Sequence, residues 1–181
     1  MNRIDAFKEM MSKALNPEDA AQMALFLEKA GFFEAPASTK FHGAYPGGLF
    51  DHSHEVTKAL VELTEKLSLA WQKPRSPYLV GMLHDLCKID AYIVSDDGTI
   101  KHSNDMPLKG HGDKSCMLAE DLLIEMRLDP LTEEELFCIR WHMGAYDTKE
   151  NWPKLNEAIR KYPNVLYTHT ADMIASQINE M

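Results

Sequence analysis

The stretch Leu83-His84-Asp85-Leu86-Cys87-Lys88-Ile89 places an imidazole directly beside a carboxylate. Together, the side chains of His84 and Asp85 can hold one divalent cation. Helix bundles build metal sites from inward-facing side chains on facing helices, and this chain supplies further histidines and an aspartate at wide spacing around the pair. The candidate metal ligands are His52, His84, Asp85, His111, His142 and Asp172.

The ligand types favour a particular set of cations. Imidazole and carboxylate without thiolate suit Mn, Fe, Co, Ni, Mg or catalytic Zn better than a structural zinc site. The three cysteines, Cys87, Cys116 and Cys138, lack CxxC spacing, which is typical of free buried thiols in a reducing compartment. We therefore expect one or two divalent cations per chain, bound by nitrogen and oxygen.

The order of the candidate ligands resembles the HD superfamily of metal-dependent phosphohydrolases, whose signature is a histidine, an adjacent His-Asp pair and a distant aspartate. His52, the His84-Asp85 pair and Asp172 follow that order. Residues 47–53 resemble the segment that carries the family's first histidine, and residues 82–88 resemble its "LLHDIGK" word, with cysteine in place of the glycine. The resemblance implies that these four residues hold the first cation.

Two further segments resemble the extra histidine motifs of HD proteins that hold two metals, which include HD-GYP phosphodiesterases and HD-type 3′→5′ exoribonucleases. They are Lys109-Gly110-His111 and Trp141-His142-Met143-Gly144. Met143 stands where the exoribonuclease-like proteins carry a second adjacent histidine, and the Gly-Tyr-Pro word of the cyclic-dinucleotide enzymes is absent. The resemblance implies that His111 and His142 hold a second cation, with Asp85 shared between the two.

The resemblance also implies a function. We expect a metal-dependent phosphohydrolase that uses metal-activated water to cleave a phosphate ester of a nucleotide or related small molecule. Asp85 and Lys88 are the expected catalytic residues, and Lys88, Lys109 and Arg140 are the candidates for binding substrate, with Lys114 nearby. The alternatives are an HD-type di-iron oxygenase, a 3′→5′ exoribonuclease-like phosphodiesterase and a non-catalytic HD module for binding or signalling.

Length and charge limit the possible partners. The 181 residues, 45% of them apolar, fit a single HD-type domain with a helical extension at residues 1–40 and an HD core at 41–176. A net charge of −9 argues against binding long nucleic acid or an anionic membrane surface. No apolar run reaches the roughly twenty residues of a membrane span, and the N-terminus lacks a signal-peptide pattern, so we expect a cytoplasmic protein. The oligomeric state is left open.

The apolar periodicity predicts an all-α bundle with one inserted β-hairpin. The hairpin is expected near residues 91–102, around the turn Asp96-Asp97-Gly98. Asn16 before Pro17 predicts a helix start, and Thr132 with Glu135 predicts a capping box. The expected helices are residues 3–15, 17–30, 51–70, 76–86, 111–127, 132–143, 153–161 and 164–179.

Four other histidines receive weaker assignments. His54 is expected to be exposed, because it lies only two residues from His52 on the same helix. His169 lies one helical turn before Asp172 and is a candidate to orient that carboxylate. His42 and His102 are expected to be solvated, with contact to substrate as the alternative.

Overall fold

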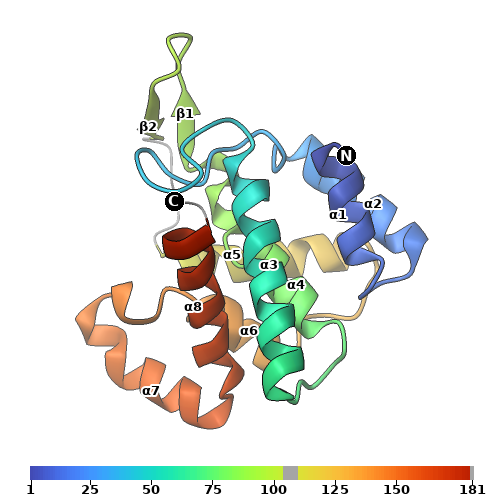
Figure 1. Cartoon of the computed structure of the whole chain (residues 1–181), viewed down its shortest axis with the longest axis vertical. Coiled ribbons are helices and arrows are strands. Elements are labelled where there is room, and N and C mark those ends of the chain that lie inside the picture. The colour runs from blue at the N-terminus through green and yellow to red at the C-terminus, as the bar shows by residue number, and fades with distance from the viewer. Residues whose placement is uncertain (104–109, 180–181) are drawn as a thin grey trace.

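The computed structural model describes residues 1–103 and 110–179 and confirms the all-α class with one small hairpin (Figure 1). The two strands, β1 (Tyr92–Val94) and β2 (Ile100–His102), are antiparallel. The helices are α1 (Arg3–Met11), α2 (Pro17–Lys29), α3 (Gly48–Leu67), α4 (Ser76–Leu83), α5 (His111–Glu125), α6 (Glu133–Arg140), α7 (Trp152–Lys161) and α8 (Asn164–Ile174).

Local signals account for the helix starts. The side-chain oxygen of Asn16 accepts a hydrogen bond from the Asp19 N–H at 2.9 Å, and Pro17 occupies the first position of α2. At α6, the Thr132 hydroxyl accepts from the Glu135 N–H, and the Glu135 carboxylate accepts from the Thr132 N–H. Both caps satisfy backbone donors that would otherwise have no partner in the first turn.

The expected boundaries of two helices differ from those in the structure. The first helix ends at Met11 rather than at residue 15, because turn hydrogen bonds reverse the chain before Asn16. Helix α3 begins at Gly48, so His52 lies in the second turn and not in the first. A side chain at Gly48 would collide with the carbonyl of Gly43, so glycine allows the preceding loop to fold against the start of α3.

Two of the helices expected to carry candidate ligands end before those residues. Helix α4 ends at Leu83, His84 caps it, and a 3₁₀ turn over Leu86–Asp90 follows. Helix α6 ends at Arg140, two residues before His142. Backbone bends at helix ends therefore direct these side chains inward.

Helix α3 packs closely on α4 and also contacts α8 (Figure 1). A Cβ atom at Gly81 would lie 2.7 Å from the Cα atom of Thr57, so glycine is needed where the two helices meet. Buried apolar residues of the described chain form one cluster that extends from Phe7 to Ala175. This packing brings α3, the end of α4, the end of α6 and α8 around one point.

The hairpin extends away from the helices at one end of the molecule (Figure 1). Tyr92 pairs with His102, and Gly98 adopts a positive φ of 80° in the connecting turn. Within the described part of the chain, no helix combines the length and apolar character that a membrane crossing requires.

Candidate metal centre

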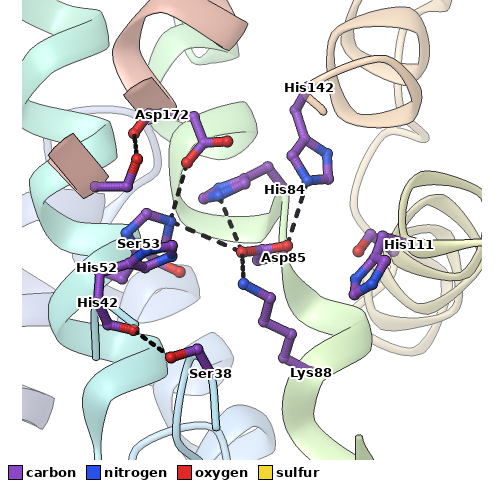
Figure 2. A network of polar contacts seen from close by, with 12 residues as sticks. Ser38, His42, His52, Ser53, His84, Asp85, Lys88, His111, His142 and Asp172 are labelled. Carbon is purple, nitrogen blue, oxygen red and sulfur yellow. Dashed lines mark hydrogen bonds and ion pairs between the residues drawn. The ribbon is translucent and has the colours of Figure 1, made fainter. Parts of the chain in front are cut away.

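Asp85 lies at the centre of a cluster of histidine rings (Figure 2). Its side chain is buried, and its carboxylate oxygens lie 3.7 Å from Nε2 of His52, 3.5 Å from Nε2 of His84 and 3.3 Å from Nε2 of His142. These rings come from α3, from the end of α4 and from the turn after α6. The structure therefore brings together residues that are far apart in the sequence.

Backbone carbonyls determine how two of the rings are protonated. The Nδ1 atom of His84 lies 2.8 Å from the Gly81 carbonyl, and that of His142 lies 2.7 Å from the Ile139 carbonyl. A carbonyl oxygen only accepts, so each Nδ1 is the donor, and Nε2 presents a lone pair toward Asp85 whenever the ring is neutral. Burial lowers the pKa of His84. Burial also opposes protonation of His142, but the Asp85 carboxylate outweighs it and raises the pKa of that ring.

The facing atoms lack ordinary partners. The Nε2 atoms of His84 and His142 and the Oδ1 atom of Asp85 are buried, and none has a hydrogen-bond partner among the described residues. Burying polar atoms in this way is costly, and a cation between them removes that cost. The arrangement fits a divalent cation with nitrogen and oxygen ligands.

Asp172 approaches from α8 on the side of His52. Its Oδ1 atom lies 3.2 Å from Nε2 of His52 (Figure 2). Burial opposes ionisation of Asp172, but the hydrogen bond to His52 and the neighbouring histidines outweigh it and lower the pKa to about 2. Asp172 is therefore ionised at neutral pH and lies within the cluster, as a carboxylate that binds a cation must.

Lys88 is buried beside Asp85, not on a solvated face. Its Nζ atom lies 2.6 Å from Oδ2 of Asp85. Burial alone would lower the pKa of Lys88, but the Asp85 carboxylate raises it above its usual value. Burial likewise opposes ionisation of Asp85, and the charge of Lys88 overcomes it and holds the Asp85 pKa well below its usual range. Both groups are charged at neutral pH.

His111 lies at the start of α5 and faces the cluster (Figure 2). A side chain at Gly112 would collide with the Arg140 carbonyl, so the start of α5 is packed directly against the end of α6. His111 is exposed as a residue, but partial burial of its ring lowers its pKa, which favours the neutral form. The structure therefore places all six candidate ligands around the same centre, while their roles as ligands stay predictions.

Cys87 also reaches this centre, which the sequence did not indicate. Its Sγ atom lies 3.4 Å from Nδ1 of His111, and ligand atoms of Asp85, Cys87 and His111 all lie within 4.8 Å of one another. Burial and the Asp85 charge raise the pKa of the thiol to about 12. Cys116 and Cys138 are also free thiols.

His42, expected to be solvated, is half-buried beside the cluster. Its ring centroid lies 4.6 Å from that of His52. The Ser38 hydroxyl holds this loop in place, because it accepts from the Phe41 N–H and donates to the His42 carbonyl, each at 2.9 Å. Nothing in the local pattern predicts this contact, since it depends on how a loop folds back over α3.

The expectations for His169 and His54 were wrong. Nδ1 of His169 lies 2.8 Å from the backbone carbonyl of His142, so the ring contacts the turn after α6 instead of orienting Asp172. His54 is half-buried rather than exposed, because its ring stacks on that of Phe50 with centroids 5.5 Å apart. His102 is exposed on β2, as expected.

The lysine and arginine side chains that are candidates for binding phosphate differ in their surroundings. Lys109 lies outside the described residues. Lys114 is buried in an ion pair with Asp90, and Arg140 is paired with both Asp113 and Asp147. All three described side chains are thus paired with carboxylates, but the partner of Lys88 is the central carboxylate of the cluster, Asp85.

A cavity of about 400 Å³ opens beside the cluster. Asp85, Lys88 and Asp172 line it together with two aromatic side chains, Phe41 and Tyr146. Phe41 is 79% exposed and Tyr146 is 70% exposed. The volume falls in the range of small-molecule sites, and the charged side chains that line the cavity belong to the His/Asp cluster.

No family model matches the chain, and no solved structure matches it. Among curated proteins, it is similar to a dihydroneopterin 2′,3′-cyclic phosphate phosphodiesterase from Methanocaldococcus jannaschii. The two are 38% identical over 72 residues, which cover 38% of this chain and 29% of that protein. The match thus spans less than a third of the relative's length.

Proposed function

We propose that the chain is a metal-dependent phosphohydrolase of the HD type, which cleaves a phosphoester bond in a nucleotide or related small molecule. The observation that carries the proposal is the buried Asp85 carboxylate, which faces the Nε2 atoms of His84 and His142 and lies beside the charged Lys88 and an open cavity. Partial similarity to a phosphodiesterase supports hydrolysis of a phosphoester bond.

In this proposal, His52, His84, Asp85 and Asp172 hold a first cation, and His111 and His142 hold a second one with Asp85 shared. The two Asp85 oxygens suit sharing, because Oδ2 faces His52 and His84 while Oδ1 faces His142. A bound divalent cation polarises a phosphoryl oxygen and lowers the pKa of water. The donor set leaves Mn, Fe, Co, Ni, Mg and Zn as candidates.

Lys88 supplies positive charge where the phosphoryl group would lie. Its ammonium group lines the cavity and is held by Asp85, so it needs little rearrangement to neutralise charge that develops on the phosphoryl oxygens. The backbone carbonyls of Gly81 and Ile139 fix the orientation of two histidines in advance. Preorganisation of this kind places the reacting groups before substrate binds.

The cavity favours a substrate that combines a phosphoester with a planar ring. Phe41 and Tyr146 offer exposed aromatic faces next to the polar cluster, and aromatic rings stack favourably on one another. The name of the matched relative makes 2′,3′-cyclic phosphates the first compounds to test. Opening such a ring yields a monoester and no free phosphate, so products need to be separated by chromatography.

The decisive experiment compares wild type with Asp85→Asn and, as a control, Asp121→Asn on the exposed side of α5. Each protein is loaded with Mn, Fe, Co or Zn and given 2′,3′-cyclic nucleotides, dihydroneopterin cyclic phosphate and nucleoside monophosphates. We expect wild type and the control to hydrolyse at least one of these compounds, and Asp85→Asn to lose both activity and bound metal. Full activity and metal content in Asp85→Asn would overturn the proposal.

A further inference from the structure

We propose that Cys87 is a sulfur ligand of the second cation, together with His111 and Asp85, and that it makes this position selective for thiophilic cations such as Zn, Co or Fe over Mg. The inference rests on the metal centre of the proposed function and adds a ligand type to it. It also revises the expectation of a centre with nitrogen and oxygen ligands alone.

The first support is the position of the thiol. Cys87 Sγ lies 3.4 Å from Nδ1 of His111, and the ligand atoms of Asp85, Cys87 and His111 lie within 4.8 Å of one another. Atoms that share one cation at bond lengths of about 2.0–2.3 Å are necessarily this close. Cys87 is 2% exposed as a residue, so its thiol is shielded from solvent beside the cluster.

A hydrogen bond fixes the two ligand-bearing segments relative to each other. The Cys87 N–H donates to the Ser115 hydroxyl at 3.1 Å, which connects the 3₁₀ turn to α5, the helix that begins with His111. Ser115 is fully buried. The approach of sulfur to imidazole is therefore built into the packing of the turn against α5.

The second support is independent of the cysteine. Oδ1 of Asp85 and Nε2 of His142 are buried, lie 3.3 Å apart, and have no hydrogen-bond partner among the described residues. Both atoms present lone pairs when His142 is neutral, because its Nδ1 donates to Ile139. These atoms indicate a cation on the Oδ1 side of Asp85.

The chemistry of sulfur gives the selectivity. A coordinated cysteine binds as thiolate, so the cation replaces the thiol proton, which passes to solvent. Thiolate favours Zn, Fe and Co, whereas Mg requires hard oxygen ligands in near-octahedral geometry. A position with sulfur, imidazole and a shared carboxylate therefore binds Mg poorly.

Cobalt spectroscopy tests this ligand directly. Metal-free full-length protein is titrated with Co²⁺ under anaerobic, reducing conditions. The proteins are wild type, Cys87→Ser and the control Cys116→Ser, which alters a free thiol that is half-buried. We expect a sulfur-to-cobalt charge-transfer band in wild type and Cys116→Ser, absent in Cys87→Ser. The affinity of the second position for Zn should fall about tenfold or more in Cys87→Ser, a loss of roughly 1.4 kcal/mol or more.

A measurement on wild type covers the case in which Cys87→Ser fails to fold. Cadmium-113 NMR of the cadmium-loaded protein should give one resonance shifted by sulfur coordination and one typical of nitrogen and oxygen ligands. Equal charge-transfer bands in all three proteins, or no sulfur-shifted cadmium signal, would overturn the role of Cys87. The proposed function survives that result if wild type hydrolyses a phosphoester with a metal at the first position, whereas absence of both metal binding and hydrolysis overturns the two together.

Discussion

The contact between Lys88 and Asp85 makes a prediction at the scale of one residue. Replacing Lys88 with methionine keeps most of the side-chain volume and removes the charge. We expect turnover to fall about tenfold or more, because roughly 1.4 kcal/mol of transition-state stabilisation corresponds to each factor of ten. Metal content should not fall, since Asp85 loses a competing positive charge and stays ionised beside the cation.

The measurement is kcat together with metal content per chain. Lys58→Met is the matched control, because Lys58 forms an exposed pair with Glu55 on α3, away from the cluster. Unchanged kcat in Lys88→Met would show that the ammonium group has no catalytic role and only balances the charge of Asp85.

At the scale of elements, Glu135 connects the start of α6 with the start of α4. Its fully buried carboxylate accepts from Arg75 Nε at 3.2 Å, from the Ser76 hydroxyl at 2.9 Å and from the Thr132 N–H at 2.7 Å. Glu135→Gln removes the charge that compensates the buried Arg75. We expect the free energy of unfolding to fall by about 3–5 kcal/mol.

Chemical denaturation measures this loss. The control is Glu133→Gln in the same turn, where the carboxylate forms an exposed pair with Lys161. Solvent screens that pair, so its loss should change stability far less than the loss of the Glu135 charge. Equal effects of the two substitutions would contradict the view that Glu135 is a structural connection between α4 and α6.

The crossing of α3 and α4 gives a second prediction at this scale. A Cβ atom at Gly81 would lie 2.7 Å from Thr57 Cα, a backbone atom that cannot rotate away. Gly81→Ala should separate the helices, cost about 1–3 kcal/mol of stability and displace His52 from Asp85. Metal affinity measured by isothermal titration should therefore fall, and wild-type affinity in this variant would mean that the helices adjust without moving the ligands.

At the scale of the whole molecule, the candidate ligands join five helical regions that are distant in sequence. A cation that binds only the folded chain stabilises it by about 2.7 kcal/mol when its free concentration is a hundred times Kd. For a chain of this size we expect Tm to rise by roughly 5–10 °C. Thermal denaturation with and without Zn or Mn measures this change in Tm. Asp85→Asn is the control, and its Tm should not change when the cation is added. No shift in wild type would contradict a cation at the centre of the bundle.

The organisation as one domain, with residues 1–40 as an extension, stays a prediction. The buried apolar cluster nevertheless includes Phe7 from α1 and Phe32 from the segment after α2. The rings of Phe32 and Phe50 pack edge to face with centroids 6.2 Å apart. The N-terminal helices thereby cover the start of α3, the helix that carries His52.

The sequence by itself determined the helical class, the hairpin, the caps at Asn16 and Thr132, and the set of candidate ligands. These features depend on short-range chemistry, because apolar periodicity, capping and turn residues act within a few positions. The resemblance to HD proteins grouped candidate ligands that lie too far apart in the sequence for any local pattern to relate them.

Only the tertiary structure decided where α4 and α6 end, that His42 lies beside His52, that His169 contacts the His142 carbonyl, and that Cys87 reaches His111. Each of these depends on which surfaces of distant segments meet. The packing of Gly112 against the Arg140 carbonyl, for example, sets the approach of α5 to α6 and with it the direction of His111. Such contacts are determined by close packing across the core, which has no period along the chain.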